Sequence, residues 1–476
     1  MFDYRKYATQ KLAALGPKYL PFADVATAEV PLSRLFRLSL FQVTVGMALV
    51  MLVGTLNRVM IVELNVPATL VAVMLALPLV FAPFRTLIGY KSDVHVSALG
   101  LRRIPYIWKG TLCQFGGFAI MPFALLVLSG YGEAVDAPRW IGLSAAALAF
   151  LLVGAGVHIV QTVGLALATD LVEEADQPKV VGLMYVMLLL GMVLSALVYG
   201  ALLENYTPGR LIQVIQGSAV VTVALNLIAV WKQETRSRER AAQMKVARPQ
   251  PFRQAWAQLA QTDGIMRLLV VICLGTFGFG MADVLLEPYG GQALGLSVAD
   301  TTKLTALFAT GTLVGFGIAS RLLSGDTVPV NLALTGATIG IPGFALIIFA
   351  SMGGGVVSFL AGIFLVGLGT GLFGHATLTA TMRSAPKERI GLALGAWGAA
   401  QACAAGVGVA LAGIVRDVLV GLQGATGNAV QTPYNVVFGI EAISLLAAVA
   451  VMWPIARRVA RHPKINNSNT NGVEAS

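Results

Sequence analysis

Ionisable side chains inside long apolar stretches are the residues of this sequence best placed to do chemistry. A charged group at membrane depth is costly, and such residues typically mark ion paths, proton relays or ligand contacts. A neutral imidazole can also coordinate a metal ion through a ring nitrogen. Each of these residues therefore needs either a polar partner or a function. The candidates are Arg58, His158, Asp283, Glu287, His375 and Glu441.

Two sequence motifs contain most of the charged residues among these candidates. Asn57 and Arg58 lie in the first apolar stretch, shortly before Glu63. Asp283 and Glu287 are four residues apart, so they share one face of a helix. We predict that these five residues form a linked polar cluster near the outer side of the surface between the two halves of the protein. The alternative is a purely structural ion pair between Arg58 and one of the two acids, because structural pairs also occupy such sites.

The two histidines inside apolar stretches, His158 and His375, are candidate ligands for a metal-containing molecule. The alternative for each is an imidazole that is hydrogen-bonded within the helix bundle. His158 is deep in its stretch and has Gln161 three positions further on. His375 is closer to the basic residue Arg383, where water can satisfy it more easily. On this ground we expect His158 to be the stronger candidate.

No enzyme signature accompanies these residues. The sequence has no P-loop after a strand, no nucleophile elbow and no Cys/His cluster with metal-ligand spacing. The acidic run from Asp170 to Asp176 is interpreted as a solvated helix end rather than a metal site. We therefore predict that the protein is not an enzyme and holds neither a nucleotide nor a structural metal.

Twelve apolar stretches position the candidates, and each is long enough to cross a bilayer. A helix rises about 1.5 Å per residue, so about 20 apolar residues cross a hydrocarbon core of about 30 Å. Backbone polar groups cannot stay unpaired in lipid, which requires that each stretch be a helix. The composition agrees, with 57% hydrophobic and 12% charged residues. We predict an all-α integral membrane protein whose twelve transmembrane helices begin near Leu38, Val66, Ile104, Trp140, Val180, Leu211, Ile265, Val298, Val328, Val356, Ile390 and Pro433.

Lysine and arginine fall almost entirely on one side of the predicted membrane. The N-terminal segment, the connections after even-numbered helices and the C-terminal tail hold 28 of the 33 basic residues, and the other connections hold 5. Basic residues stay on the cytoplasmic side, so both termini are predicted to be cytoplasmic. The net charge of +10 is thus mainly a topology signal, with some attraction to anionic membrane lipid, and does not indicate nucleic-acid binding.

A basic segment divides the chain into two halves of six predicted helices. The halves repeat each other weakly, because Gly46-Met-Ala matches Gly280-Met-Ala and Gly154-Ala-Gly matches Gly367-Leu-Gly in the same order. Two such repeats of one orientation are typical of the major facilitator fold, with two pseudo-symmetric six-helix bundles. The predicted parts are a cytoplasmic or interfacial N-terminal segment (1–37), the first bundle (38–232), a basic linker (233–264), the second bundle (265–457) and a cytoplasmic tail (458–476).

The connection between the second and third helices carries Gly89, Asp93, Arg102 and Arg103. A glycine, an acid and then paired bases resemble the loop motif of major facilitator proteins, although extra residues separate the acidic from the basic part. An aspartate at this place is expected to face a helix N-terminus, where the helix dipole favours negative charge, and to pair with a nearby base.

Longer motifs resemble one family within that superfamily. Residues 54–64, Gly-Thr-Leu-Asn-Arg-Val-Met-Ile-Val-Glu-Leu, are similar to the first helix of the bacteriochlorophyll delivery family, the PucC/LhaA group. Residues 279–291, Phe-Gly-Met-Ala-Asp-Val-Leu-Leu-Glu-Pro-Tyr-Gly-Gly, are similar to its seventh helix. Residues 84–93 and 103–110 fit its second and third helices, and the resemblance covers essentially the whole chain.

The resemblance implies a function in photosynthesis. Members of the family assist the assembly of light-harvesting antenna complexes in the inner (intracytoplasmic) membrane of purple bacteria. The implied partners are bacteriochlorophyll as a transient ligand, antenna polypeptides and pigment-synthesis enzymes. The family supplies no agreed pigment ligands, so His158, His375 and Gln161 are our own hypothesis; magnesium accepts imidazole or an amide oxygen. Two alternatives stay open: a proton-coupled transporter of a small soluble solute, and a scaffold that binds antenna helices only.

The predicted topology has a direct test. Green fluorescent protein fused after Ser476 is expected to fluoresce, because the C-terminus is predicted to be cytoplasmic. Alkaline phosphatase at the same position should be inactive, and an active fusion would overturn the orientation.

Overall fold

The computed structural model describes residues 31–80, 88, 92, 101–130, 134, 136–173, 176–234, 257, 259–261, 264–325, 327–384, 390–423 and 430–461. All regular secondary structure in these ranges is helical, which confirms the predicted all-α class. Ten helical segments among them are long and apolar enough to cross a membrane. One of the ten contains two helices joined at a kink, and a shorter apolar helix, α5, is additional. The described residues therefore include part of every predicted span.

The first half of the chain begins with one long, composite helix. It comprises α3 and α4, followed by two π-helical segments, η2 and η3. Asn57 and Arg58 lie between these two segments, and Glu63 is the last residue of η3. Short π-helical stretches are frequent at functional sites. The bounds in this half are α3 Leu32–Leu38, α4 Leu40–Leu49, η2 Val50–Leu56, η3 Val59–Glu63, α5 Ala68–Val80, α7 Ile104–Ser129, α8 Arg139–Asp170, α9 Gln177–Leu202 and α10 Pro208–Val230.

The second half has the same all-helical character. Its first span is interrupted at Met281, between α13 and α14, just before Asp283. The bounds are α13 Ile265–Gly280, α14 Ala282–Leu294, α15 Val298–Leu323, α16 Pro329–Phe349, η6 Ala350–Gly354, α17 Gly355–Ser384, α18 Ile390–Gln423 and α19 Thr432–Arg461. Most helices begin within three residues of the predicted positions. The first helix begins at Leu32, earlier than the predicted start near Leu38. Its added turn packs into the protein, because Leu35 and Leu38 are both fully buried.

The chain forms two compact units whose composition differs slightly from the predicted halves. Unit 1 contains Met1–Val66, Leu77–Pro249 and the short segment Leu296–Ala306. Unit 2 contains Pro67–Ala76, Gln250–Gly295 and Leu307–Ser476. Helices α5 and α15 therefore each contribute to both units. The predicted boundaries of the linker and the tails stay predictions.

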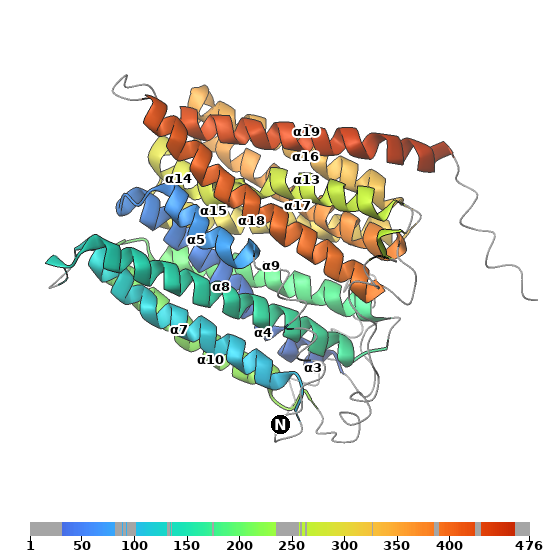
Figure 1. Ribbon diagram of the computed structural model, residues 1–476, viewed down its shortest axis with the longest axis horizontal. Helices are drawn as coiled ribbons and strands as arrows, with labels where there is room; N and C mark the ends of the chain where they lie inside the picture. Colours follow the sequence, from blue (N-terminus) through green and yellow to red (C-terminus); the bar gives the residue numbers. More distant parts are fainter. Residues whose placement is uncertain are drawn as a thin grey trace, which may run out of the picture. The chain divides into compact units, whose positions relative to one another are not determined.

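Helices α7 and α8 make the most extensive packing in unit 1 and run side by side (Figure 1). Their backbones approach closely because glycines face the contact: a Cβ atom on Gly117 would lie 2.6 Å from the Ala149 carbonyl oxygen. Small residues allow this approach, on which helix association in membranes depends. The hairpin fixes the N-terminus of α7 relative to the C-terminus of α8.

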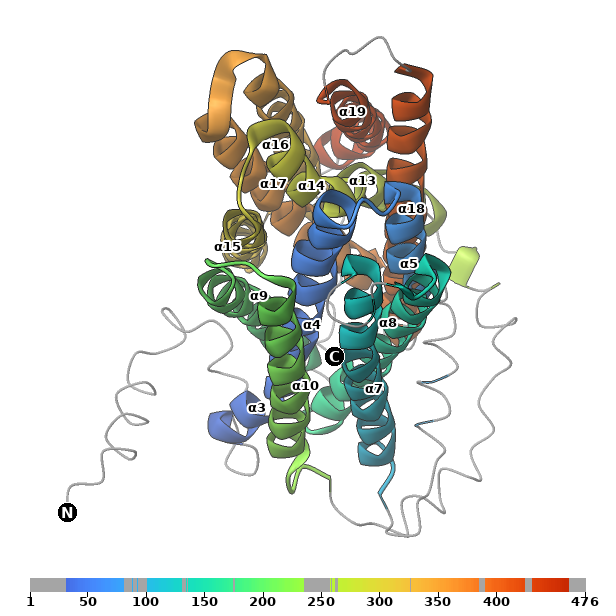
Figure 2. The same ribbon diagram turned by 90° about the vertical axis from the view of Figure 1, so that its left-hand side faces the viewer.

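Helices α16 and α17 form the corresponding hairpin in unit 2 (Figure 2). They are joined by η6, where Gly353 and Gly355 have φ angles of +130° and +63°. Residues with a Cβ rarely adopt positive φ, so glycine is needed at both positions. Helix α19 packs against α16 in the same unit.

Two neighbouring glycines on α7 test this packing. Gly117→Val should destabilise the protein by about 1–3 kcal/mol, because its side chain would be forced into the α8 backbone. Gly116→Val is the matched control, since no atom lies within 4 Å of the Cβ position at Gly116. Thermal unfolding of the two purified variants in detergent measures the difference. Equal melting temperatures would contradict the close contact of α7 with α8.

Candidate functional site

The π-helical end of the first helix buries a charged group in unit 1. Asn57 is fully buried, and Arg58 is only 4% exposed. The Arg58 guanidinium forms an ion pair with the exposed carboxylate of Glu63 and donates a hydrogen bond to the Leu296 carbonyl oxygen at 3.1 Å. A buried guanidinium is tolerated only when it is paired in this way. Asn57, Arg58 and Glu63 therefore lie together, as predicted from their spacing.

Tyr206, in the connection between α9 and α10, lies within electrostatic reach of this group. Burial raises the pKa of its phenol to about 12; the nearby Glu63 carboxylate adds to the increase and Arg58 opposes it. Tyr206 therefore stays protonated at physiological pH. The sequence analysis did not identify it.

A second group of ionisable residues lies in unit 2, around the helix break at Met281. Asp283 is in the first turn of α14, where the helix dipole favours negative charge, and Glu287 is one turn further along and 5% exposed. Glu441 of α19 is fully buried, with its carboxylate close to Asp283 and to the backbone amide of Ala282. No side chain in the described part of the chain donates a hydrogen bond to the Glu441 carboxylate.

Asp283 and Glu287 thus gain a third acid from a distant part of the sequence. Arg58 and the two acids belong to different units. The predicted link between them stays a prediction.

A third polar cluster in unit 2 holds the start of α5. The Asp417 carboxylate accepts a hydrogen bond from the Thr69 backbone amide at 2.7 Å, which caps the helix N-terminus. Arg416 pairs with Asp417 at 2.8 Å and donates to the Gln292 side chain at 2.9 Å. Tyr434 donates to the same Gln292 oxygen at 2.6 Å. Sequence reasoning missed this cluster, because its members are up to several hundred residues apart.

The candidate pigment ligands are divided between the two units. His158 and Gln161 are half-buried on α8 in unit 1. His375 is half-buried on α17 in unit 2, with its ring 4.1 Å from that of Phe316 between centroids. Its Nδ1 atom is buried, and no group among the described residues hydrogen-bonds to it. The expectation that water satisfies His375 more easily than His158 stays a prediction.

The paired arginines of the loop motif are fixed by an aspartate at the end of α8. Asp170 accepts hydrogen bonds from Arg102 at 2.6 Å and from Arg103 at 3.0 Å. Arg103 also donates to the Ser92 hydroxyl at 2.9 Å. Asp170 is exposed and is the last residue of α8, in agreement with its interpretation as a solvated helix end, and the α7–α8 hairpin also brings it to the paired bases. Gly89 and Asp93 lie outside the described residues.

Glu234 caps the N-terminus of α7. Its carboxylate follows α10 in the chain and accepts from the backbone amides of Arg102, Arg103 and Ile104, at 2.7 to 3.2 Å. These amides are the unpaired donors at the start of α7, and the helix dipole favours the charge. No short-range signal in the sequence identifies Glu234, since its partners are about 130 residues away.

The profile of a protein family described as PUCC protein matches residues 55–460. The chain belongs to this family. It is 70% identical over 460 residues to protein PucC of Rhodobacter capsulatus, which covers 96% of this chain and 100% of that protein. It is 60% identical to protein PucC of Rhodovulum sulfidophilum, over 90% of this chain and 95% of that protein. A more distant relative, 28% identical over 91% of this chain and 98% of its own length, is the bacteriochlorophyll synthase 44.5 kDa chain of Rhodobacter capsulatus.

Solved structures show the fold of this PUCC family member. A D-xylose–proton symporter aligns with a TM-score of 0.66 at 15% identity, over 88% of this chain and 96% of the symporter. A bacterial homolog of the human lysosomal transporter Spinster aligns with a TM-score of 0.64 at 15% identity, over 93% of this chain and 98% of that chain. Both confirm the predicted major facilitator fold. The chain is thus a multi-pass membrane protein.

The helix cap supplied by Glu234 can be tested by removing its charge. Glu234→Gln should destabilise the protein by about 1–2 kcal/mol, the usual cost of losing a charged N-terminal cap. Glu204→Gln changes an exposed glutamate in the same unit and is the control. Thermal unfolding of both variants measures the effect. A Glu234 variant as stable as the Glu204 variant would contradict the capping role.

Proposed function

We propose that the protein is an assembly factor for light-harvesting antenna complexes that binds bacteriochlorophyll within the membrane and delivers it to antenna polypeptides. The observation that carries the proposal is the family membership: the chain matches PucC proteins over nearly its whole length at 60–70% identity. The motifs at 54–64 and 279–291, which carry the resemblance to the bacteriochlorophyll delivery family, are both helical, and each holds a buried charged residue, Arg58 and Glu287. Pigment-synthesis enzymes are proposed as further partners, and the inner membrane with cytoplasmic termini as the location.

His375 gives the proposal a specific point of contact. Bacteriochlorophyll is a flat, apolar ring system that carries magnesium, and a neutral imidazole nitrogen can be its axial ligand. The buried Nδ1 atom of His375 has no partner in the described part of the chain, and Phe316 offers an aromatic face beside it. A buried nitrogen without a hydrogen bond costs free energy unless a ligand satisfies it. The ring contact with Phe316 shifts our hypothesis from His158 to His375.

The experiment is an absorption spectrum of the protein purified from a phototrophic strain. We expect a bacteriochlorophyll band whose intensity per protein falls about tenfold or more in His375→Ala. Mutation of a residue that only hydrogen-bonds to a metal ligand already lowers metal affinity by about tenfold or more. His375→Gln should retain part of the band, because an amide oxygen still coordinates magnesium. His462→Ala, in the C-terminal tail, is the control. A band unchanged in His375→Ala would exclude His375 as a ligand, and no band in the wild type would exclude pigment binding.

The assembly role has a separate test in cells. A strain without the gene should lose most antenna absorbance, and the wild-type gene should restore it. Normal antenna levels in the deletion strain would contradict the proposal even if the purified protein binds pigment.

The second candidate is a proton-coupled transporter, which the ionisable residues Asp283 and Glu441 of unit 2 favour. Acidic residues at membrane depth often form proton relays in transporters. A transporter would show uptake of a soluble solute that increases with a proton gradient and is lost in Asp283→Asn. The same preparation would carry no pigment band, so the two functions are distinguished by one spectrum.

A further inference from the structure

A cavity of about 750 Å³ lies within unit 2, at the end where α13 and α16 begin and α17 and α19 end. The charge asymmetry of the sequence assigns this end to the cytoplasm. The cavity has the size of a small-molecule site, for which volumes of about 300–1,000 Å³ are usual. It contains none of the residues discussed as pigment ligands or buried acids.

The inner wall of the cavity is apolar and built from buried residues. Leu268 and Val271 come from α13, Ala333 from α16 and Met452 from α19, and each is at most 8% exposed. Among the described residues of this wall, the polar side chain is that of Thr377, whose hydroxyl already donates to the Phe373 carbonyl oxygen at 2.8 Å. It also accepts from the Trp397 indole at 3.3 Å. The wall therefore suits a hydrocarbon chain.

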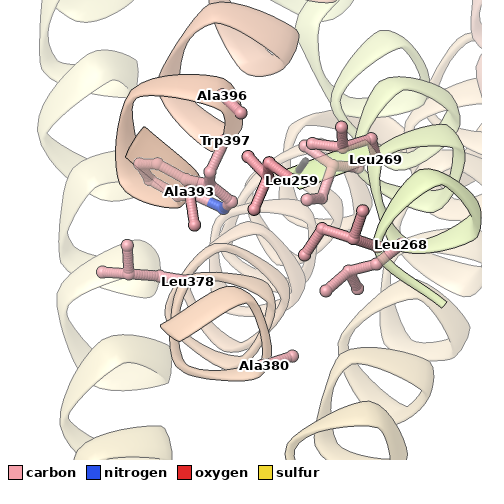
Figure 3. Packing of buried hydrophobic residues seen from close by; sticks show 10 residues of the cluster. Leu259, Leu268, Leu269, Leu378, Ala380, Ala393, Ala396 and Trp397 are labelled. Atoms are coloured by element: carbon pink, nitrogen blue, oxygen red, sulfur yellow. The ribbon is translucent and has the colours of Figure 1, made fainter. Parts of the chain in front are cut away.

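A packed cluster supports this wall from behind. Figure 3 shows Leu259, which precedes α13, between Trp397 of α18 and the side chains of Leu268 and Leu269. Leu268 and Ala380 belong both to this cluster and to the cavity lining. Because its wall is part of a buried core, the cavity is a built feature and not a surface irregularity.

The mouth of the cavity is polar and positively charged. Arg267, Gln261 and Ser384 line it and are exposed. The Arg267 guanidinium forms no hydrogen bond or ion pair with another described residue. The other described charges at this end of unit 2 are arginines too, namely Arg321, Arg383 and Arg457; Asp263, Asp326 and Glu388 lie outside the described residues. The mouth therefore favours an anionic head group.

The cavity lies at the level expected for lipid head groups. Trp453 of α19 is 48% exposed, and the Arg457 guanidinium lies 4.9 Å from the centroid of its ring. Exposed tryptophan and arginine side chains of this kind mark the boundary between hydrocarbon and water. Met452 and Ile455, which line the cavity, are on the same turns of α19.

We propose that this cavity is a binding site for an anionic glycerophospholipid of the cytoplasmic leaflet. One acyl chain fills the apolar interior, where each buried methylene contributes about 0.8 kcal/mol, and the phosphate pairs with Arg267. The inference uses the predicted topology and is independent of the pigment hypothesis.

Native mass spectrometry of the full-length protein tests the site with two probes, phosphatidylglycerol and phosphatidylcholine. We expect the wild type to retain phosphatidylglycerol preferentially. Arg267→Gln should weaken that binding roughly fivefold, which corresponds to the loss of one basic residue near anionic lipid. The matched control is Arg321→Gln, an exposed arginine at the same end that does not line the cavity, and it should change binding less than twofold.

A third variant tests the interior. Ala333→Phe places a large side chain in the cavity and should weaken binding of both lipids. An excess of inorganic phosphate should not displace phosphatidylglycerol, because phosphate lacks the acyl chain. Equal affinities of Arg267→Gln and Arg321→Gln would overturn the proposal, and so would displacement by phosphate. Since Arg267 is exposed, its comparison with Arg321 holds even if Ala333→Phe does not fold.

Discussion

The close approach of helix backbones at glycine is the interaction on which each unit depends. Lipid tails are as apolar as the side chains, so helices in a bilayer associate through tight packing and hydrogen bonds rather than through the hydrophobic effect. A Cβ atom on Gly156 would lie 2.5 Å from the Gly110 carbonyl oxygen of α7, and one on Gly362 would lie 2.7 Å from the Gly343 carbonyl oxygen of α16. The first contact holds the α7–α8 hairpin that brings Asp170 to Arg103. The second holds α17, which carries His375.

Charges at membrane depth fall into two kinds in this protein. Arg58 is paired with Glu63, five residues further on, and Arg416 with its neighbour Asp417, so their charges are neutralised locally. Glu441 is fully buried, and no side chain among the described residues hydrogen-bonds to its carboxylate. A buried group without a compensating partner is expensive, and such groups concentrate at functional sites. The acids near the break in the seventh span are therefore stronger functional candidates than the arginines.

Sequence reasoning predicted the spans and the fold well, since both follow from the length of apolar stretches and from regular repeats. It also placed Arg58 and Glu63 together, because they are near neighbours on one helix. It missed Glu234 and Asp417, both of which cap helices that begin far away in the sequence. Its ranking of His158 above His375 stays a prediction. The two omissions share one cause: a side chain's partners across a bundle are set by helix packing, which no local pattern records.

The two tightest helix pairs, α7 with α8 and α16 with α17, are each formed by consecutive spans. Contacts between neighbours in the sequence form early, because little chain entropy is lost in closing a short connection. Each hairpin can pair as soon as its second helix enters the bilayer during synthesis. In the α16–α17 hairpin, the positive φ angles of Gly353 and Gly355 allow the sharp reversal of the chain between the two helices. The protein is then assembled from helix hairpins that have already formed. Long-range caps such as Glu234 can form only after the sixth span has been inserted.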